Sequence, residues 1–436
     1  MPSRPACIKT EVLRRPQMHY AKTASKLREQ IIQFSGELSF NWGKVVRRFL
    51  TEAIYGIQAR QSVRLTEIAR ALGEEIPVKK TQYRLCRQLG REGLGTRLMD
   101  AICRMGARGV EKKTLLVLDL SDITKKYARK MEYMARVRDG SHKCLGNGYW
   151  TLSVIATDVG KPPLVPLYNH LYSQKSPDYQ SENTEIRRAI RQVIKHTHKR
   201  GVWVLDRGGD RGAIFEEMMN QELSFLIRLK KTRNLVYRRG EHLVEDLAAV
   251  CPMIHAERIV KQEGGKETIY DLEFGALPVK LPGKDEPLAL VVVRGFGQKP
   301  MTLLTSLRVT RGRKSLWWVI SAYLTRWRIE ETIRFIKQSY QVEDIRLLTY
   351  IRLQNMMAIL LAVAYFAMAY LGLRIKLRVL AGHVLKAARR LFGIPDFQFY
   401  ALADGIREVL FGRQKGLERI NPLLQTHEHQ LSLFAP

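Results

Sequence analysis

Two aspartates in this 436-residue chain stand where they could bring carboxylates together. Apolar runs at 115–118 and 202–205 lead directly into Asp119 and Asp206. Continuous apolar runs this short are typical of strands buried on both faces, and the exit of such a strand is where open α/β sheets bind ligands. Two such strands side by side would place both carboxylates together, and a divalent cation would offset their repulsion.

Each aspartate also has an ordinary structural explanation, because Asp often starts turns and caps helices at the ends of strands. Asp122 and Asp210 lie close by and compete for the same role. We favour Asp119 and Asp206 because each ends its apolar run directly.

A third acid follows much later, in a segment whose periodicity predicts one helix over 315–340. At about 100° per residue, one arc of about 60° on this helix holds Tyr323, Arg326, Glu330 and Lys337. An apolar stripe adjoins this polar row and would pack on a core. The alternative is a solvated face with ion pairs between Glu330 and an arginine four residues away.

Three converging carboxylates are suited to phosphoryl transfer. Two metal ions about 3.5–4 Å apart can activate a nucleophilic oxygen and stabilise the leaving oxygen, and Mg²⁺ binds through a few carboxylates and phosphate oxygens. Arg326 and Lys337 would then bind the neighbouring phosphates. Tyr323 would donate a hydrogen bond to a phosphate or stack on a base.

The charge of the chain favours a polyanionic partner. Lys and Arg total 73 against 42 acidic residues, a net charge of +31, and nucleic acid is the polyanion that best matches such an excess. Near the N-terminus, a helical pattern at 65–72, a turn, and a second helix with Lys79, Lys80 and Arg84 predict a DNA-binding helix-turn-helix. Any amphipathic helical pair gives a similar pattern.

Other features exclude competing classes of protein. The five cysteines are widely spaced and form no C-x-x-C pair, which argues against a zinc site or a disulfide framework and favours the cytoplasm, near the nucleoid. The 18 residues 356–373 carry no charge and could span a membrane by length. We expect a helix buried in the protein core and no membrane partner.

The chain is predicted to be an α/β protein with helical ends. Residues 1–108 read as a helical DNA-binding region, and 376–436 as a helical C-terminal region. Three strands, a helix, a strand, a helix and a strand are expected between 109 and 230, which is an α/β layer arrangement. Short β-like runs at 231–312 indicate a β-rich insertion, and 313–375 returns to the core.

At the acidic residues the sequence resembles the DDE transposases of bacterial insertion sequences, specifically the insertion-sequence-4 group. That group is marked by Tyr, two residues, Arg, three residues, Glu, six residues and Lys, and Tyr323, Arg326, Glu330 and Lys337 meet this spacing in full. Residues 119–122 (DLSD) resemble the D-x-S-D block of the group, and the second acid matches as DRGGD at 206–210.

The resemblance implies a ribonuclease H-like core interrupted by the β-rich insertion, with Asp119, Asp206 and Glu330 as catalytic metal ligands. It implies two Mg²⁺ ions, with Mn²⁺ as a substitute, and cleavage and strand transfer at terminal inverted repeats and target DNA. It also implies hairpin ends and a homodimer on paired ends. Members of the group can hold a flipped base with an aromatic residue of the insertion. This insertion contains no Trp, so the residue with that role is not assigned.

Two other functions remain open from the sequence. A transposase-derived DNA-binding protein that no longer cuts would bind DNA ends with Mg²⁺ yet never nick them. A ribonuclease H-like nuclease without strand transfer would cleave branched DNA or RNA–DNA hybrids with no preference for inverted repeats.

Overall fold

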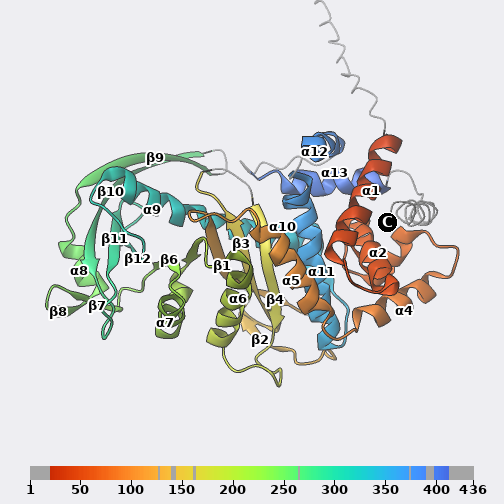
Figure 1. The fold of residues 1–436 in the computed structure, drawn as a ribbon, viewed down its shortest axis with the longest axis horizontal. Coiled ribbons are helices and arrows are strands. Elements are labelled where there is room, and N and C mark those ends of the chain that lie inside the picture. Colours follow the sequence, from red (N-terminus) through yellow and green to blue (C-terminus); the bar gives the residue numbers. More distant parts are fainter. Residues whose placement is uncertain are drawn as a thin grey trace, which may run out of the picture.

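The structure, a computed structural model, describes residues 20–125, 128–138, 144–160, 164–263, 266–372, 375–388 and 397–411. Within these ranges helices flank a long central sheet, and a β-rich region extends the sheet on one side (Figure 1). The chain is therefore a mixed α/β protein, as predicted.

The central sheet has ten strands in the order β2-β3-β1-β5-β6-β12-β11-β10-β9, with β4 paired to β3. The strands nearest the acidic residues are β1 (Leu115–Thr124), β2 (Ala135–Arg138), β3 (Leu145–Thr157), β4 (Leu164–Tyr172), β5 (Val202–Leu205) and β6 (Ser224–Arg228). β3 runs antiparallel to β1 and β4, whereas β5 is parallel to β1 and β6. β2 was not predicted. The runs 115–118 and 202–205 lie in β1 and β5, as predicted, but β1 continues for five residues beyond Asp119, so Asp119 lies within its strand and not at the exit.

The apolar runs form strands here because both faces of the sheet are covered. The first four residues of β1 and all four of β5 are buried. The covering helices are α5 (Leu94–Ala107), α6 (Glu182–Thr197), α10 (Trp327–Ser339) and α11 (Tyr350–Met368), and α7 (Gly212–Asn220) packs on α6. Ser181 caps the N-terminus of α6, since its hydroxyl accepts a hydrogen bond from the Thr184 amide at 3.1 Å.

The uncharged segment forms a core helix, as predicted. Residues 350–372 are long and apolar enough to cross a membrane, but 94% of this window is buried inside the protein. Asn355 anchors α11 with its Oδ1 accepting from the Gly95 amide (2.7 Å) and its Nδ2 donating to the carbonyls of Leu89 and Arg91 (2.8 Å each). These bonds satisfy backbone groups at the end of the preceding helix, in the loop after it and in the first turn of α5, and they hold this connection on the core.

The helices at the two ends of the described chain pack together. The N-terminal set is α1 (Tyr20–Leu38), α2 (Lys44–Arg60), α3 (Leu65–Leu72) and α4 (Val78–Leu89), and the C-terminal pair is α12 (Ile375–Ala387) and α13 (Phe399–Phe411). Helix α13 lies against α1 and α2 (Figure 1). Helices α3 and α4 occur where the helix-turn-helix was predicted, and Gly73 ends α3 in the left-handed conformation that a turn of this kind favours (φ 64°).

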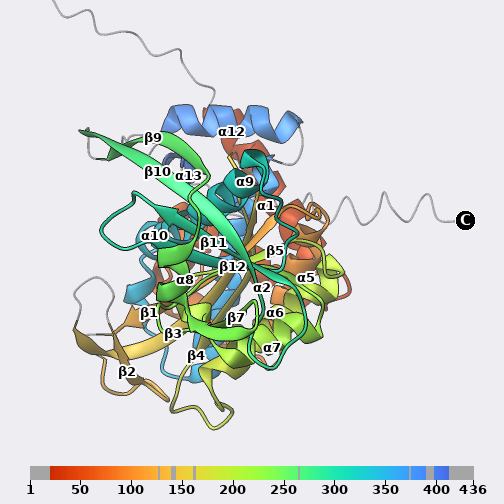
Figure 2. The same ribbon diagram turned by 90° about the vertical axis from the view of Figure 1, so that its left-hand side faces the viewer.

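The β-rich region continues the central sheet. It contains β7 (Asn234–Tyr237), β8 (Gly240–Leu243), α8 (Val244–Val250), β9 (His255–Glu263), β10 (Lys266–Val279), β11 (Leu288–Arg294) and β12 (Met301–Thr305). Strand β12 pairs with β6 through Leu303↔Arg228, Leu304↔Ile227 and Thr305↔Leu226. Figure 2 shows β9 and β10 as a long curved ribbon at the end of the sheet.

The β9–β10 ribbon differs from the short β-like runs that the sequence suggested. Strand β10 is 14 residues long and pairs with β9 along its first nine residues. From 255 to 263 and from 266 to 273 the ribbon mixes charged and apolar residues, so this part contains no continuous apolar run that would mark a buried strand. The apolar end of β10, 274–279, pairs with β11.

Candidate active site

Strands β1 and β5 bring the first two acids to neighbouring positions of the sheet: Asp119 lies in the middle of β1, and Asp206 directly follows β5. Their parallel register pairs Leu115 with Val202 and Val117 with Val204. Continued by two residues, this register aligns Asp119 with Asp206 on neighbouring strands. The Asp206 carboxylate also caps the short 3₁₀ turn Arg207–Gly209, since its Oδ1 accepts a hydrogen bond from the Gly208 amide at 2.7 Å.

The third acid reaches this edge from α10, together with an arginine. Nη2 of Arg326 lies 2.5 Å from Oε1 of Glu330, and Nη1 lies 3.6 Å from Oδ2 of Asp119. Arg326 is 16% exposed and Asp119 is 19% exposed, whereas Glu330 is half exposed. One largely buried guanidinium therefore lies between carboxylates that are 211 positions apart in the sequence.

The surroundings of Asp119 disfavour the charged form of its carboxyl group. Burial raises its pKa to about 7, Arg326 opposes that rise, and the carboxylates of Asp206 and Glu330 add to it. A carboxyl raised in this way gains most from a nearby positive charge, because a cation offsets both the burial and the like-charge repulsion.

A cavity of about 750 Å³ opens beside two of the acids. Asp119, Glu330, Asp122 and Lys337 line it, and Asp206 does not. Lys337 Nζ lies 3.7 Å from Asp122 Oδ1, and the Thr124 hydroxyl donates a hydrogen bond to Asp122 Oδ2 at 2.8 Å. The cavity thus has an acidic side from β1 and a basic residue from α10, which suits a phosphate group bound next to a cation.

The predicted single helix over 315–340 is wrong. Two helices, α9 (Arg313–Thr325) and α10, meet at Arg326, whose amide bonds to the Tyr323 carbonyl at 3.0 Å in place of the carbonyl four residues back. The Thr325 hydroxyl donates to the Ser321 carbonyl at 2.7 Å, a back-bond that often bends helices.

The break separates Tyr323 from the rest of the predicted polar row. Tyr323 is buried, with 6% exposed, and does not line the cavity. Its ring centroid lies 5.8 Å from Cζ of Arg326, so it contacts the arginine face-on. We therefore assign Tyr323 to positioning Arg326, in place of the direct DNA contact that the helical wheel suggested.

The structure gives Asp210, four positions after Asp206, a different role from that of Asp206. The Asp210 side chain is fully buried, and its two oxygens accept hydrogen bonds from the Lys230 amide and from Arg233 Nε, each at 2.7 Å. Asp210 is thus a structural residue that ties the turn after β5 to the segment after β6. Asp122, in contrast, lines the same cavity as Asp119, and its place in the DLSD segment is the sequence signal for it.

Of the three predicted N-terminal DNA contacts, two are exposed lysines and the third is an arginine held in ion pairs. Lys79 and Lys80 are exposed on α4, and their contact with DNA stays a prediction. Arg84 forms ion pairs at 2.7 Å with both Glu52 and Glu74, whose carboxylates are almost buried. Arg48 pairs with the same two acids, at 2.6 and 2.9 Å, so a structural role in this cluster of four charges explains Arg84 better than DNA contact.

The donor set fits a divalent cation in its chemistry. Asp119, Asp206 and Glu330 offer only carboxylate oxygens, the ligands that Mg²⁺ and Mn²⁺ prefer. In the part of the chain that the structure describes, no three His, Cys, Asp or Glu side chains already form a group that could hold a metal ion. Arg326 lies between two of the acids, so we expect metal binding to need the Arg326–Glu330 ion pair to open.

Comparison with known proteins gives a partial match in sequence. Residues 166–366 match the family model described as the transposase DDE domain. The matched segment runs from β4 to α11 and includes Asp206 and Glu330, whereas Asp119 lies before it. The match supports a DDE transposase. No curated protein sequence matches this chain.

A solved structure is also similar to the chain. It is a cryo-EM structure of the piggyBac transposase synaptic complex with hairpin DNA, with a TM-score of 0.42 and 10% sequence identity. The alignment covers 89% of this chain and 84% of that chain.

Proposed function

We propose that this protein is a DNA transposase whose catalytic acids are Asp119, Asp206 and Glu330. The observation that carries the proposal is the approach of the three acids from three elements: β1 and β5 hold Asp119 and Asp206 in parallel register, and Arg326 on α10 lies between Asp119 and Glu330. The match of residues 166–366 to the transposase DDE domain and the net charge of +31 support the same function.

In this mechanism the three acids hold the metal ions and the basic residues hold the DNA. When bound, Mg²⁺ ions would activate the attacking oxygen and stabilise the leaving oxygen of the phosphodiester. Arg326 would exchange its carboxylate partners for a phosphate, which it can bind through two parallel hydrogen bonds. Lys337, on the same cavity, would bind a neighbouring phosphate as a point charge.

The finer assignment is an insertion-sequence-4 transposase that acts as a homodimer on terminal inverted repeats. Its support is the spacing of Tyr323, Arg326, Glu330 and Lys337. A ribonuclease H-like core is supported by three antiparallel strands followed by alternating helices and parallel strands. Hairpin formation and a location near the nucleoid are part of the same proposal.

The test is the variant Glu330→Gln, assayed on duplex DNA that carries the element's own ends. We expect cleavage with Mg²⁺ to fall by roughly a thousandfold or more, which is about 4 kcal/mol of transition-state stabilisation. DNA affinity, measured by fluorescence anisotropy, should stay within about threefold of that of the unmodified protein, because Glu330 is assigned to metal binding and not to DNA contact. Unreduced cleavage would overturn the assignment.

A matched control removes a different acid from the same cavity. Glu343 lines the cavity and is exposed, and Glu343→Gln makes the same chemical change without touching the three acids. It should cleave at the normal rate. Capture of the released ends in a target plasmid then separates a transposase from a nuclease, because only the transposase joins the ends to new DNA.

A further inference from the structure

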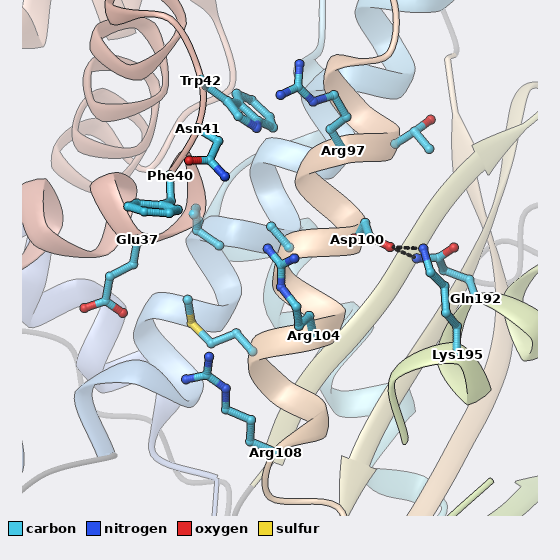
Figure 3. A pocket seen from close by; sticks show the side chains of 14 residues that line it. Glu37, Phe40, Asn41, Trp42, Arg97, Asp100, Arg104, Arg108, Gln192 and Lys195 are labelled. Atoms are coloured by element: carbon cyan, nitrogen blue, oxygen red, sulfur yellow. Dashed lines mark hydrogen bonds and ion pairs between the residues drawn. The ribbon is translucent and has the colours of Figure 1, made fainter. Parts of the chain in front are cut away.

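A second cavity, of about 870 Å³, lies between the α1–α2 loop and helices α5 and α6. It shares no lining residue with the cavity beside Asp119. Figure 3 shows Phe40 and Trp42 on one side and Arg97 and Arg104 facing them from α5. We call this cavity, with its wall from Arg97 to Arg108, the arginine groove.

Three arginines form a row along the groove. Arg97, Arg104 and Arg108 are separated by seven and four residues, so they lie within an arc of about 40° and extend for about 16 Å along α5. All three are exposed. Within the described ranges, none of them forms an ion pair with an acid, so their charges are available to an anion.

The wall of the groove is held in place by a separate cluster. Asp100 accepts hydrogen bonds from Gln192 (2.9 Å), Lys195 (2.9 Å) and His196 (2.8 Å), all on α6. These bonds tie α5 to α6 and neutralise one of the two acids that line the groove. The other is Glu37, and four basic side chains also line the groove, which leaves an excess of positive charge.

The opposite side of the groove presents aromatic rings. Phe40 is 74% exposed, the highest value among the exposed large hydrophobic residues. Asn41, next to it, adopts the left-handed conformation (φ 63°), which turns the chain sharply between the two rings. The Arg97 guanidinium lies over the Trp42 ring, 4.5 Å from its centroid. Trp42 thereby fixes the first arginine of the row, and the Phe40 ring stays open to solvent.

We propose that the arginine groove binds a single-stranded segment of DNA, with the arginines on successive phosphates and Phe40 stacked on a base. A basic groove that follows the backbone, combined with exposed aromatic rings, is the general design of single-strand binding sites. Duplex DNA keeps its bases stacked internally, so it would leave Phe40 without a partner. The identity of the ligand as DNA rests on the proposed function, whereas the site itself is separate from the catalytic acids.

The phosphate contacts are tested by fluorescence anisotropy of the full chain with a labelled 15-nucleotide single strand, without metal. Each phosphate contact contributes about 0.7 to the slope of log affinity against log salt for a single strand. Arg104→Ala should therefore reduce that slope by about 0.7, and Arg104→Glu should lower affinity by more than Arg104→Ala. Arg239→Glu, at an exposed position in the turn between β7 and β8 and away from the groove (Figure 1), makes the same charge change and should have little effect.

The stacking contact is tested at Phe40. Phe40→Leu should lower single-strand affinity about tenfold, because a base–aromatic stack is worth about 1–3 kcal/mol. Phe40→Trp keeps a stacking ring and should restore the affinity. A 5-iodouracil oligonucleotide should crosslink to Phe40 or Trp42 on irradiation, and peptide mass spectrometry identifies the site.

Two results would overturn the proposal. One is an unchanged single-strand affinity in both Arg104→Glu and Phe40→Leu. The other is an equal loss of affinity, in the same two variants, for a labelled 15-base-pair duplex. That result would make the groove a contact for the duplex backbone alone. Both results are distinguishable from a failure of the catalytic assignment. That failure would appear as cleavage of DNA by Glu330→Gln, whatever the single-strand affinity of the groove.

Discussion

Arg326 and Glu330 form an ion pair of 2.5 Å within the candidate active site, and the same arginine lies 3.6 Å from Asp119. In this arrangement the guanidinium supplies the positive charge that the carboxylates need. A metal ion and Arg326 would therefore compete for Asp119 and Glu330 until DNA phosphate gives the arginine another partner. Metal binding and DNA binding should support each other through this one side chain.

Removing the arginine should reveal that competition. In Arg326→Met we expect the DNA-free protein to bind Mn²⁺ about tenfold more tightly, a change of about 1.4 kcal/mol, because the competing cation is gone. Isothermal titration with MnCl₂ measures this. Cleavage of end DNA should fall in the same variant, since the phosphate contact is lost.

The matched control is Arg334→Met. Arg334 lies on the same helix and lines the same cavity, but its guanidinium pairs with Glu331 at 2.5 Å. Its Mn²⁺ affinity should stay close to that of the unmodified protein. An equal increase in both variants would mean that general charge, and not the Arg326–Glu330 pair, sets the affinity.

Asp206→Asn should abolish cleavage without loss of stability, whereas Asp210→Asn should lower the stability of the fold. Asn at 206 keeps an oxygen that can accept the Gly208 amide, so the free energy of unfolding should change by less than about 0.5 kcal/mol while cleavage is lost. Asn at 210 breaks a buried ion pair with Arg233, which should cost about 3–5 kcal/mol of unfolding free energy. Urea denaturation and the cleavage assay together measure both. Similar stability losses at the two positions would contradict the assigned roles.

Asn355 should be important for the stability of the core. Asn355→Leu removes the hydrogen bonds to Gly95, Leu89 and Arg91 and leaves three backbone groups without that partner. At about 1–3 kcal/mol for each of the three polar groups left unsatisfied, we expect a loss of about 3 kcal/mol or more, measured by urea denaturation. Gln354→Leu, one residue earlier on α11, removes one weaker bond of 3.2 Å and should cost less.

Stability should also depend on His170 at acidic pH. Burial, assisted by the charge of Arg188, lowers the pKa of His170 from 6.5 to about 4. Glu185 lies 3.6 Å away, but its carboxylate is already paired with Arg188 at 2.9 Å. Between pH 6.5 and 4 the unfolded chain binds a proton that the folded protein does not, so the free energy of unfolding falls as the pH falls through this window.

The variant His170→Gln should lack this contribution. Its urea midpoint should decrease less between pH 6.5 and pH 4 than the midpoint of the unmodified protein, while above pH 6.5 the two profiles should run parallel. His198→Asn, at an exposed position with a left-handed backbone that Asn tolerates, is the control. Identical pH profiles for the unmodified protein and His170→Gln would contradict the prediction.

Patterns of neighbouring residues predicted much of the fold. The apolar runs before Asp119 and Asp206 became β1 and β5, because a run of four buried residues has few other places in an α/β protein. The helix break at Arg326 was missed, since its cause is a hydroxyl back-bond from Thr325 that periodicity does not show. The β9–β10 ribbon was missed because the residues along which its two strands pair mix charged and apolar side chains.

Contacts between distant segments could not be predicted in the same way. The i,i+4 pair of Arg326 and Glu330 was visible as an alternative, but the approach of Arg326 to Asp119 depends on how α10 packs on β1. The sequence predicted a DNA contact for Arg84, but in the structure its guanidinium pairs with Glu52, 32 positions away. The arginine groove likewise joins segments that no local pattern connects.

The pairing of β12 with β6 has a mechanical consequence. Because the β-rich region shares one hydrogen-bonded sheet with β1 and β5, it is unable to swing as a free arm about a flexible hinge. An unbroken series of paired strands joins the β9–β10 ribbon, through β11, β12 and β6, to the strands that position Asp119 and Asp206.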